Sequence, residues 1–79
     1  LIPTCKIRKD FSTYMVDILV ESGLVSSKSE AKRLIEQKGV SVDDFIVPDI
    51  KYQISIDNLK KDYIIIRVGK KKYKKVIFI

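Results

Sequence analysis

One segment of the sequence places cationic side chains at helical spacing. Lys28 and Lys32 are four residues apart, so a helix would hold them on one face, and Arg33 and Gln37 would form a neighbouring pair. Most surface helices have a charged side, and a solvated amphipathic helix is the simpler interpretation. This cationic side, however, starts at a predicted helix N-terminus, where unpaired N–H groups and the helix dipole attract phosphate. The start of this helix is therefore a natural place for a nucleic-acid backbone.

A second basic segment, from Gly69 to Lys75, carries five lysines and Tyr73. A basic tail that increases solubility or directs localisation would have the same composition. The β-forming residues Val76 to Ile79 follow, however, and they would return the run to a sheet. An anchored loop of this kind fits a defined line of phosphates better than a loose tail does. Tyr73 could stack on an unpaired base, or it could be a core or cross-strand aromatic residue.

Composition excludes several other chemistries. The chain has no His and a single cysteine, Cys5, so it can build neither a Ser-His or Cys-His catalytic pair nor a His/Cys zinc site. Its three glycines are too scattered for a nucleotide phosphate loop. Asp43 and Asp44 could be read as metal ligands or an acid–base pair, but no third ligand is near and a turn is expected there. We expect no catalysis, metal or cofactor in this chain, and the lone cysteine is compatible with a reducing, cytoplasmic setting.

Length and charge bound the remaining possibilities. A chain of 79 residues and 9.1 kDa is one small domain. Its 16 Lys and Arg exceed its 10 Asp and Glu, and the net charge of +6 is uneven, because residues 67–79 contain basic residues and no acid. No apolar run approaches the roughly 20 residues of a membrane helix, so we expect no membrane partner.

The pattern predicts two short helices. The first runs over residues 13–22, with Ser12 as its N-cap and Gly23 as its end. The second runs over residues 28–37. It starts at a capping box, in which Ser27 and Glu30 each satisfy a backbone N–H, and it stops at Gly39. The short connection between the two helices would pack them as a tight pair.

The period changes after Gly39, where strands are expected. Val40 to Val42 and residues 45–47 would form a hairpin about an Asp43-Asp44 turn, and residues 52–56 alternate as a half-buried strand does. Residues 57–62 are a turn or loop, 63–68 a central strand and 73–79 its return strand. The sequence predicts an α+β domain, with a short helical pair packed on a small, mostly antiparallel sheet. Residues 1–12 have no clear period and are predicted to be a linker or arm, which leaves 13–79 as the domain.

Two stretches resemble a known family. The sequence from Gly23 to Ile35, followed by Gly39 to Val42, resembles the signature of a small RNA-binding module first named for a ribosomal small-subunit protein, also called the alpha-L motif. Ile66 to Tyr73 is more specifically similar to the end of the C-terminal domain of bacterial-type tyrosyl-tRNA synthetases. One departure is Asp43-Asp44, where the family often has Asn-Gly. This pair is less suited to a tight two-residue turn, and its carboxylates would repel phosphate.

The resemblance implies that residues 13–79 are the tRNA-binding domain of a tyrosine–tRNA ligase and that residues 1–12 are a linker from an upstream catalytic domain. The parent enzyme would be a cytoplasmic homodimer that uses ATP, with magnesium, in a catalytic domain absent from this chain, and the fragment alone would be a monomer. Its partner would be tyrosine tRNA, held by the anticodon stem and the long variable arm. By motif position, the RNA-contacting candidates are Ser27, Lys28, Lys32, Arg33, Gln37, Lys70, Lys71, Lys72, Tyr73 and Lys74.

Three alternatives stay open on sequence grounds. The same module could belong to a ribosome-associated factor or an RNA-modifying enzyme. A basic protein-interaction domain could instead meet an acidic partner or a membrane surface. An independent small enzyme would need a catalytic constellation that this sequence does not offer.

Overall fold

The chain forms five strands and two α-helices in a computed structural model that describes residues 2–59 and 61–79. In chain order the elements are β1 (Thr4–Ile7), α1 (Met15–Glu21), α2 (Lys28–Glu36), β2 (Val40–Val42), β3 (Phe45–Ile46), a 3₁₀ turn (Ile56–Asn58), β4 (Tyr63–Val68) and β5 (Lys72–Phe78). The strands make one sheet in the order β1-β5-β4-β2-β3, in which only the β1–β5 pair is parallel among the described strands. The predicted α+β class with a mostly antiparallel sheet is confirmed.

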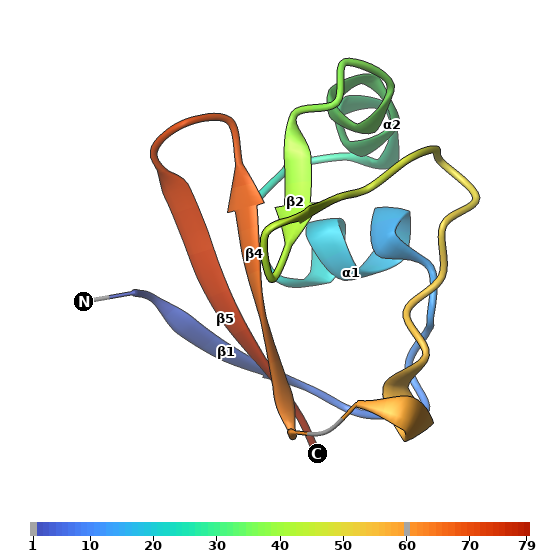
Figure 1. The fold of residues 1–79 in the computed structure, drawn as a ribbon, viewed down its shortest axis with the longest axis vertical. Helices are drawn as coiled ribbons and strands as arrows, with labels where there is room; N and C mark the ends of the chain where they lie inside the picture. The colour runs from blue at the N-terminus through green and yellow to red at the C-terminus, as the bar shows by residue number, and fades with distance from the viewer. Residues whose placement is uncertain (1, 60) are drawn as a thin grey trace.

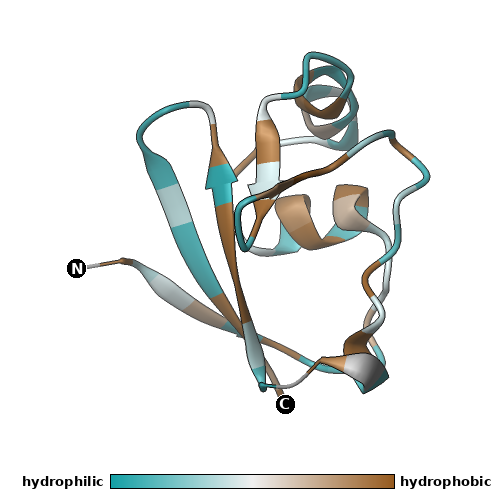
Figure 2. Cartoon of the chain, viewed as in Figure 1, coloured by the Kyte–Doolittle hydropathy of each residue, from teal (hydrophilic) through white to brown (hydrophobic). Residues whose placement is uncertain are grey.

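Both helices cover the same face of the sheet (Figure 1). The core lies between the two layers, where alternate strand residues such as Ile64, Ile66 and Val76 meet Ile18 and Ile35 of the helices, all fully buried. This alternation follows from the pleat, which points successive side chains to opposite faces. Apolar residues accordingly gather on β2, β4 and α1, while the β4–β5 loop and the outer side of α2 are hydrophilic (Figure 2).

Residues 1–12 were predicted to be a linker, but Thr4–Ile7 within them form β1 of the sheet. Thr4 to Ile7 pair in parallel with β5, with Cys5 beside Val76 and Ile7 beside Phe78. Ile7 is 3% exposed and belongs to the core. The strand has only four residues and a partner some 70 positions away, so its own sequence carries little strand signal. The folded domain therefore begins before residue 13; Leu1 lies outside the described residues.

The second helix begins as predicted, but the first does not. Ser27 caps α2 by accepting the Glu30 backbone N–H at 3.2 Å, and the Glu30 carboxylate accepts from the Ser26 N–H at 2.9 Å. The N-cap of α1 is Tyr14 rather than Ser12, and Tyr14 makes no side-chain cap. The Ser12 hydroxyl instead donates to Asp17 and accepts from the Tyr14 N–H.

Left-handed residues end both helices. Gly23, with φ +82°, ends α1 as predicted. At α2 the left-handed residue is Lys38, with φ +61°, and Gly39 follows it by donating its N–H to the Leu34 carbonyl at 2.9 Å. This is a Schellman motif with lysine where glycine is usual. A Cβ on Gly39 would lie 3.3 Å from that carbonyl oxygen, which accounts for the glycine there.

The predicted strand over residues 52–56 is wrong. Ile54 and Ile56 are buried and Gln53 and Ser55 are exposed, so the alternating burial is real. This segment, however, pairs with the residues before α1 through one bridge between Tyr14 and Gln53, and the Ile54 N–H donates to the Thr13 carbonyl at 2.7 Å. The alternating burial therefore shows that this segment is extended and lies over the core. It does not show that the segment is a strand of the sheet. The predicted turn at 57–62 includes residue 60, which lies outside the described residues.

A tight two-residue turn joins β2 and β3 despite the Asp43-Asp44 pair. Val42 pairs with Phe45, and the two aspartates have φ of +48° and +70°. Asp tolerates this region better than most residues, because its short side chain can hydrogen-bond locally. The Asp43 carboxylate is also held from outside the turn, because it accepts the Ile65 N–H of β4 at 3.0 Å. The expectation that this pair disfavours the turn is therefore wrong.

Candidate nucleic-acid interface

The lysine-rich segment forms a loop at one end of the β4–β5 hairpin. Val68 pairs with Lys72, which leaves Gly69, Lys70 and Lys71 to make the connection. Gly69 has φ +66°, a conformation that glycine adopts without strain. Its N–H donates to the Gly39 carbonyl at 2.8 Å, which ties the hairpin to the chain leaving α2. We name residues 69–72 the basic loop. It is anchored at both ends, as predicted from the strand that follows it.

A shallow hollow separates the basic loop from the helical pair. It is lined by Val68 and the loop on one side and by Leu24, Glu30 and Leu34 on the other. Arg33 and Gln37 are exposed and lie three residues beyond Glu30 and Leu34, so they border the same side of α2. The structure therefore places these two predicted residues on the side of α2 that faces the basic loop. This is the arrangement that a rigid phosphate-binding frame needs.

Lys28 and Lys32 lie on the other flank of α2, next to α1. Lys28 Nζ is 3.2 Å from Asp17 Oδ1, and this carboxylate also accepts a 2.8 Å hydrogen bond from Ser12. The Ser12 hydroxyl first, and then Lys28, hold the pKa of Asp17 below its usual range. Both lysines are exposed, but the ion pair offsets part of the charge of Lys28. The helix therefore presents its cations on two flanks rather than on one face.

The predicted residues of β5 alternate between the two faces of the sheet. Lys72 and Lys74 lie in line with the buried Val76, on the side of the helices, where Lys74 is close enough to Cys5 to influence its thiol. Burial raises the pKa of that thiol against the opposing effect of Lys74. Tyr73 lies opposite Arg67 on the other face and is 40% exposed. The structure thus separates Tyr73 from the lysines on either side of it.

Two cations outside the predicted set of residues lie on the same face as Tyr73. Arg67 pairs with Tyr73 on β4, and Lys75 is the next residue of β5 on the same face. The ammonium of Lys75 lies 4.3 Å from the centre of the Tyr63 ring, a cation–π contact. The sequence contained the evidence for Lys75, because residues 73 and 75 lie on the same face of any strand that contains both.

The Ser27 hydroxyl has a structural role in addition to its predicted one. Its oxygen accepts the Glu30 N–H at the start of α2, and this leaves its own hydrogen for another acceptor. Its side chain lies at the exposed N-terminus of the helix, next to Lys28. The geometry thus allows Ser27 to donate to a phosphate without loss of the cap.

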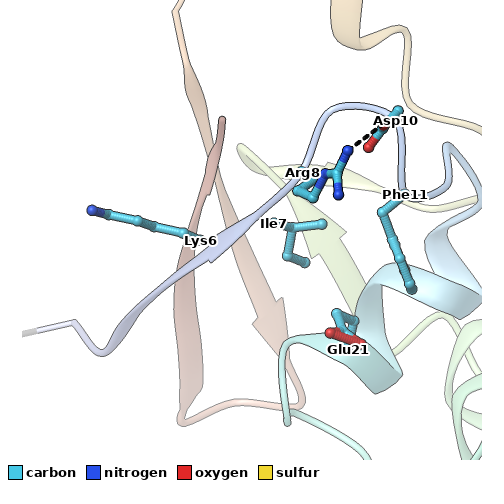
Figure 3. A pocket seen from close by; sticks show the side chains of 6 residues that line it. All are labelled: Lys6, Ile7, Arg8, Asp10, Phe11 and Glu21. Atoms are coloured by element: carbon cyan, nitrogen blue, oxygen red, sulfur yellow. Dashed lines mark hydrogen bonds and ion pairs between the residues drawn. The ribbon is translucent and has the colours of Figure 1, made fainter.

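A second hollow lies between the end of β1 and α1 (Figure 3). Its charged groups are mixed, because Arg8 and Asp10 pair at 2.9 Å and Glu21 forms the opposite wall. An acid here would repel phosphate, so this hollow does not extend the basic surface. Within the described residues no group of three or more His, Cys, Asp or Glu is placed to hold a metal, and no helix is long and apolar enough to cross a membrane.

Comparison with known proteins assigns the family. The model of the tyrosine–tRNA ligase SYY-like C-terminal domain matches residues 1–76 of this sequence. The chain belongs to this family. The match includes residues 1–12, in agreement with the place of β1 in the sheet.

Curated relatives agree with this assignment. The tyrosine–tRNA ligase of Clostridium tetani is 42% identical over 77 residues, which cover 96% of this chain and 19% of that protein. The tyrosine–tRNA ligase of Thermotoga maritima is 45% identical over 62 residues, which cover 78% of this chain and 14% of the relative. The chain therefore spans less than one fifth of these relatives.

A solved structure shares the fold. The solution structure of a tyrosyl-tRNA synthetase C-terminal domain superposes with a TM-score of 0.76 at 24% identity, over 99% of this chain and 79% of that one. At this level of identity the likeness concerns the arrangement of the strands and helices.

Proposed function

We propose that this chain is a tRNA-binding domain and that its partner is tyrosine tRNA. The observation that carries the proposal is the basic loop held against the helical pair, in a chain that belongs to the family of tyrosine–tRNA ligase C-terminal domains. The loop, Arg33 and the two lysines of the α1 flank supply cations on a frame fixed by the sheet. Folded RNA is recognised mainly through its shape, phosphates and 2′-hydroxyls, which requires such a frame more than a base-reading helix.

We propose that another part of a longer protein carries out the aminoacylation reaction. An upstream domain would activate tyrosine with ATP, and with magnesium, and transfer it to the tRNA that this domain positions. We propose that this parent is a cytoplasmic homodimer and that the fragment is monomeric. Two linked weak sites in a dimer would then bind more tightly than either alone.

The number of cations predicts how strongly tRNA binding depends on salt concentration. If about six cations each neutralise one phosphate, the logarithm of the association constant falls with the logarithm of salt concentration at a slope of roughly −4 to −5. Most of the affinity would then be independent of sequence. Selectivity would come from the spacing between the basic loop and α2, which a differently shaped RNA could not match.

The test is a binding titration with three ligands at about 50 and 200 mM salt. Tyrosine tRNA, a tRNA with a short variable arm and a linear polyanion are compared under identical conditions. A preference for tyrosine tRNA that persists at the higher salt supports the proposal. Equal binding to all three that disappears with salt would contradict recognition of this tRNA by the domain.

A further inference from the structure

The face of the sheet opposite the helices is open. Both helices and the buried core lie on one side, and no described element packs on the other (Figure 1). The open face consists of the outward residues of the three longest neighbouring strands: Thr4 and Lys6 of β1, Tyr73, Lys75 and Ile77 of β5, and Tyr63, Ile65 and Arg67 of β4.

This face is cationic. Its strand positions carry Lys6, Arg67 and Lys75 and no acid. Figure 3 shows the Lys6 side chain extending from β1 away from Ile7, which points toward the core. At the border of the face, Asp43 is 3.5 Å from Lys61 and accepts the Ile65 N–H, so its charge is already offset.

Lys75 of the open face is held in place by an aromatic ring, and neither Lys75 nor Lys6 has an acidic partner among the described residues. Lys75 rests on the ring of Tyr63, with Lys61 at 4.7 Å from the same ring. Among the ion pairs formed by the described residues, none involves Lys6 or Lys75. A cation–π contact orients an ammonium while its N–H donors stay available, which reduces the entropy lost on binding a phosphate.

The open face is continuous with the basic loop. Tyr73 directly follows the loop, and Lys75 is the next outward residue of β5. On β1, Thr4 lies beside Lys75 and Lys6 beside Ile77, which extends the line toward the edge of the sheet. Charge complementarity therefore favours a polyanion that already contacts the loop over an acidic protein or an apolar partner.

We infer that RNA bound at the basic loop continues over the open face, where Lys6 and Lys75 contact its phosphates and Tyr73 packs against an exposed base or ribose. This inference rests on the proposed function. It adds a second contact area, on the face opposite α2, to the loop and the helix.

Substitutions that remove the charge but keep a polar side chain test the inference. Lys6→Gln with Lys75→Gln is expected to reduce the salt slope of tRNA binding by about 1.4 to 1.8, because two phosphate contacts are lost. Arginine at both positions is expected to restore wild-type binding. Lys9→Gln with Lys51→Gln is the matched control, since both lysines are exposed and lie outside the loop and the open face. Thermal unfolding verifies that each variant is folded.

Tyr73 provides an independent measurement. Tyr73→Ala is expected to weaken binding by about 5-fold or more, while Tyr73→Phe retains the aromatic face and the affinity. Equal losses from both substitutions would indicate that the hydroxyl matters rather than the ring, and would contradict packing against a base or ribose.

The outcomes separate the two proposals. If Lys70→Ala with Lys71→Ala weakens binding while the Lys6 and Lys75 variant matches its control, the inference fails and the proposed function stands. If the wild-type chain does not bind tRNA, the proposed function fails and the inference fails with it. Slower acetylation of Lys6 and Lys75 in the full-length ligase without tRNA than in the domain alone would assign the face to a protein contact and overturn the inference.

Discussion

Removing two charges from the tip of the basic loop tests directly whether this loop contributes to the proposed tRNA binding. Lys70 and Lys71 are exposed and lie in the three-residue connection between β4 and β5, outside the strand ladder. Changing both to alanine therefore leaves the pairing of Val68 with Lys72 and the left-handed Gly69 in place. We expect a folded variant with weaker tRNA binding.

The size of the effect follows from the number of phosphates released. Two lost contacts reduce the slope of log affinity against log salt by about 1.4 to 1.8. Over a four-fold change from about 50 to 200 mM salt, this corresponds to about a tenfold change in the ratio of wild-type to variant affinity. The advantage of the wild type should therefore be largest at low salt.

The assay is equilibrium binding of tyrosine tRNA across that salt range, with Lys9→Ala and Lys51→Ala as a control of equal charge. The control removes the same two charges away from the loop, so it accounts for the general effect of net charge. A loop variant with the same salt slope as the wild type would refute the role of the loop. An equal change in the control would show that net charge, rather than position, determines binding.

Three further predictions follow from particular residues. Asp44→Gly should raise the free energy of unfolding by about 0.5 to 1 kcal/mol in urea denaturation, because glycine adopts φ +70° without strain. Asp17→Asn should lower stability at neutral pH; since the folded-state pKa of Asp17 is lowered, this difference should be full above about pH 4 and vanish as the pH falls through that pKa. Arg33→Ala should weaken tRNA binding more than Lys28→Ala in the same titration, because Lys28 is paired with Asp17 and lies on the flank away from the basic loop.

Each of these has a control or a contradicting result. Asp44→Asn removes the charge and retains tolerance of the left-handed region, so an equal gain from Asn and Gly would mean that charge, not backbone strain, limits the turn. A pH-independent effect of Asp17→Asn would contradict the ionised contact with Ser12 and Lys28. Equal losses from Arg33→Ala and Lys28→Ala would mean that RNA contacts both flanks of α2.

The sequence was sufficient to predict the elements whose hydrogen-bond partners are close to them in the chain. Ser27 and Glu30 mark the start of α2, because capping depends on residues three positions apart. The hairpin of β4 and β5 follows from two β-forming runs joined through Gly69. The basic loop was predicted for the same reason, since both of its anchors are its neighbours in sequence.

The features that the sequence did not predict depend on pairing between segments that are far apart in the chain. β1 depends on β5, far along the chain, and the alternating segment at residues 52–56 found the residues before α1 instead of a strand. Periodicity indicates which side of a segment is buried, but it does not select the partner. Alternation alone puts Tyr73 and Lys74 on opposite faces, but the pairing of β5 with β4 was needed to show that Tyr73 and Lys75 share the face away from the helices.

We propose that tyrosine tRNA binds to the basic loop and α2 of this domain. Mapping of backbone amide shifts on addition of tyrosine tRNA tests it most directly, because every element is observed in one experiment. We expect the largest changes at Gly69–Lys72 and at Arg33–Gln37, with little change at the exposed Phe45 and Ile46 of β3. Changes centred on β3, or none at all, would contradict it.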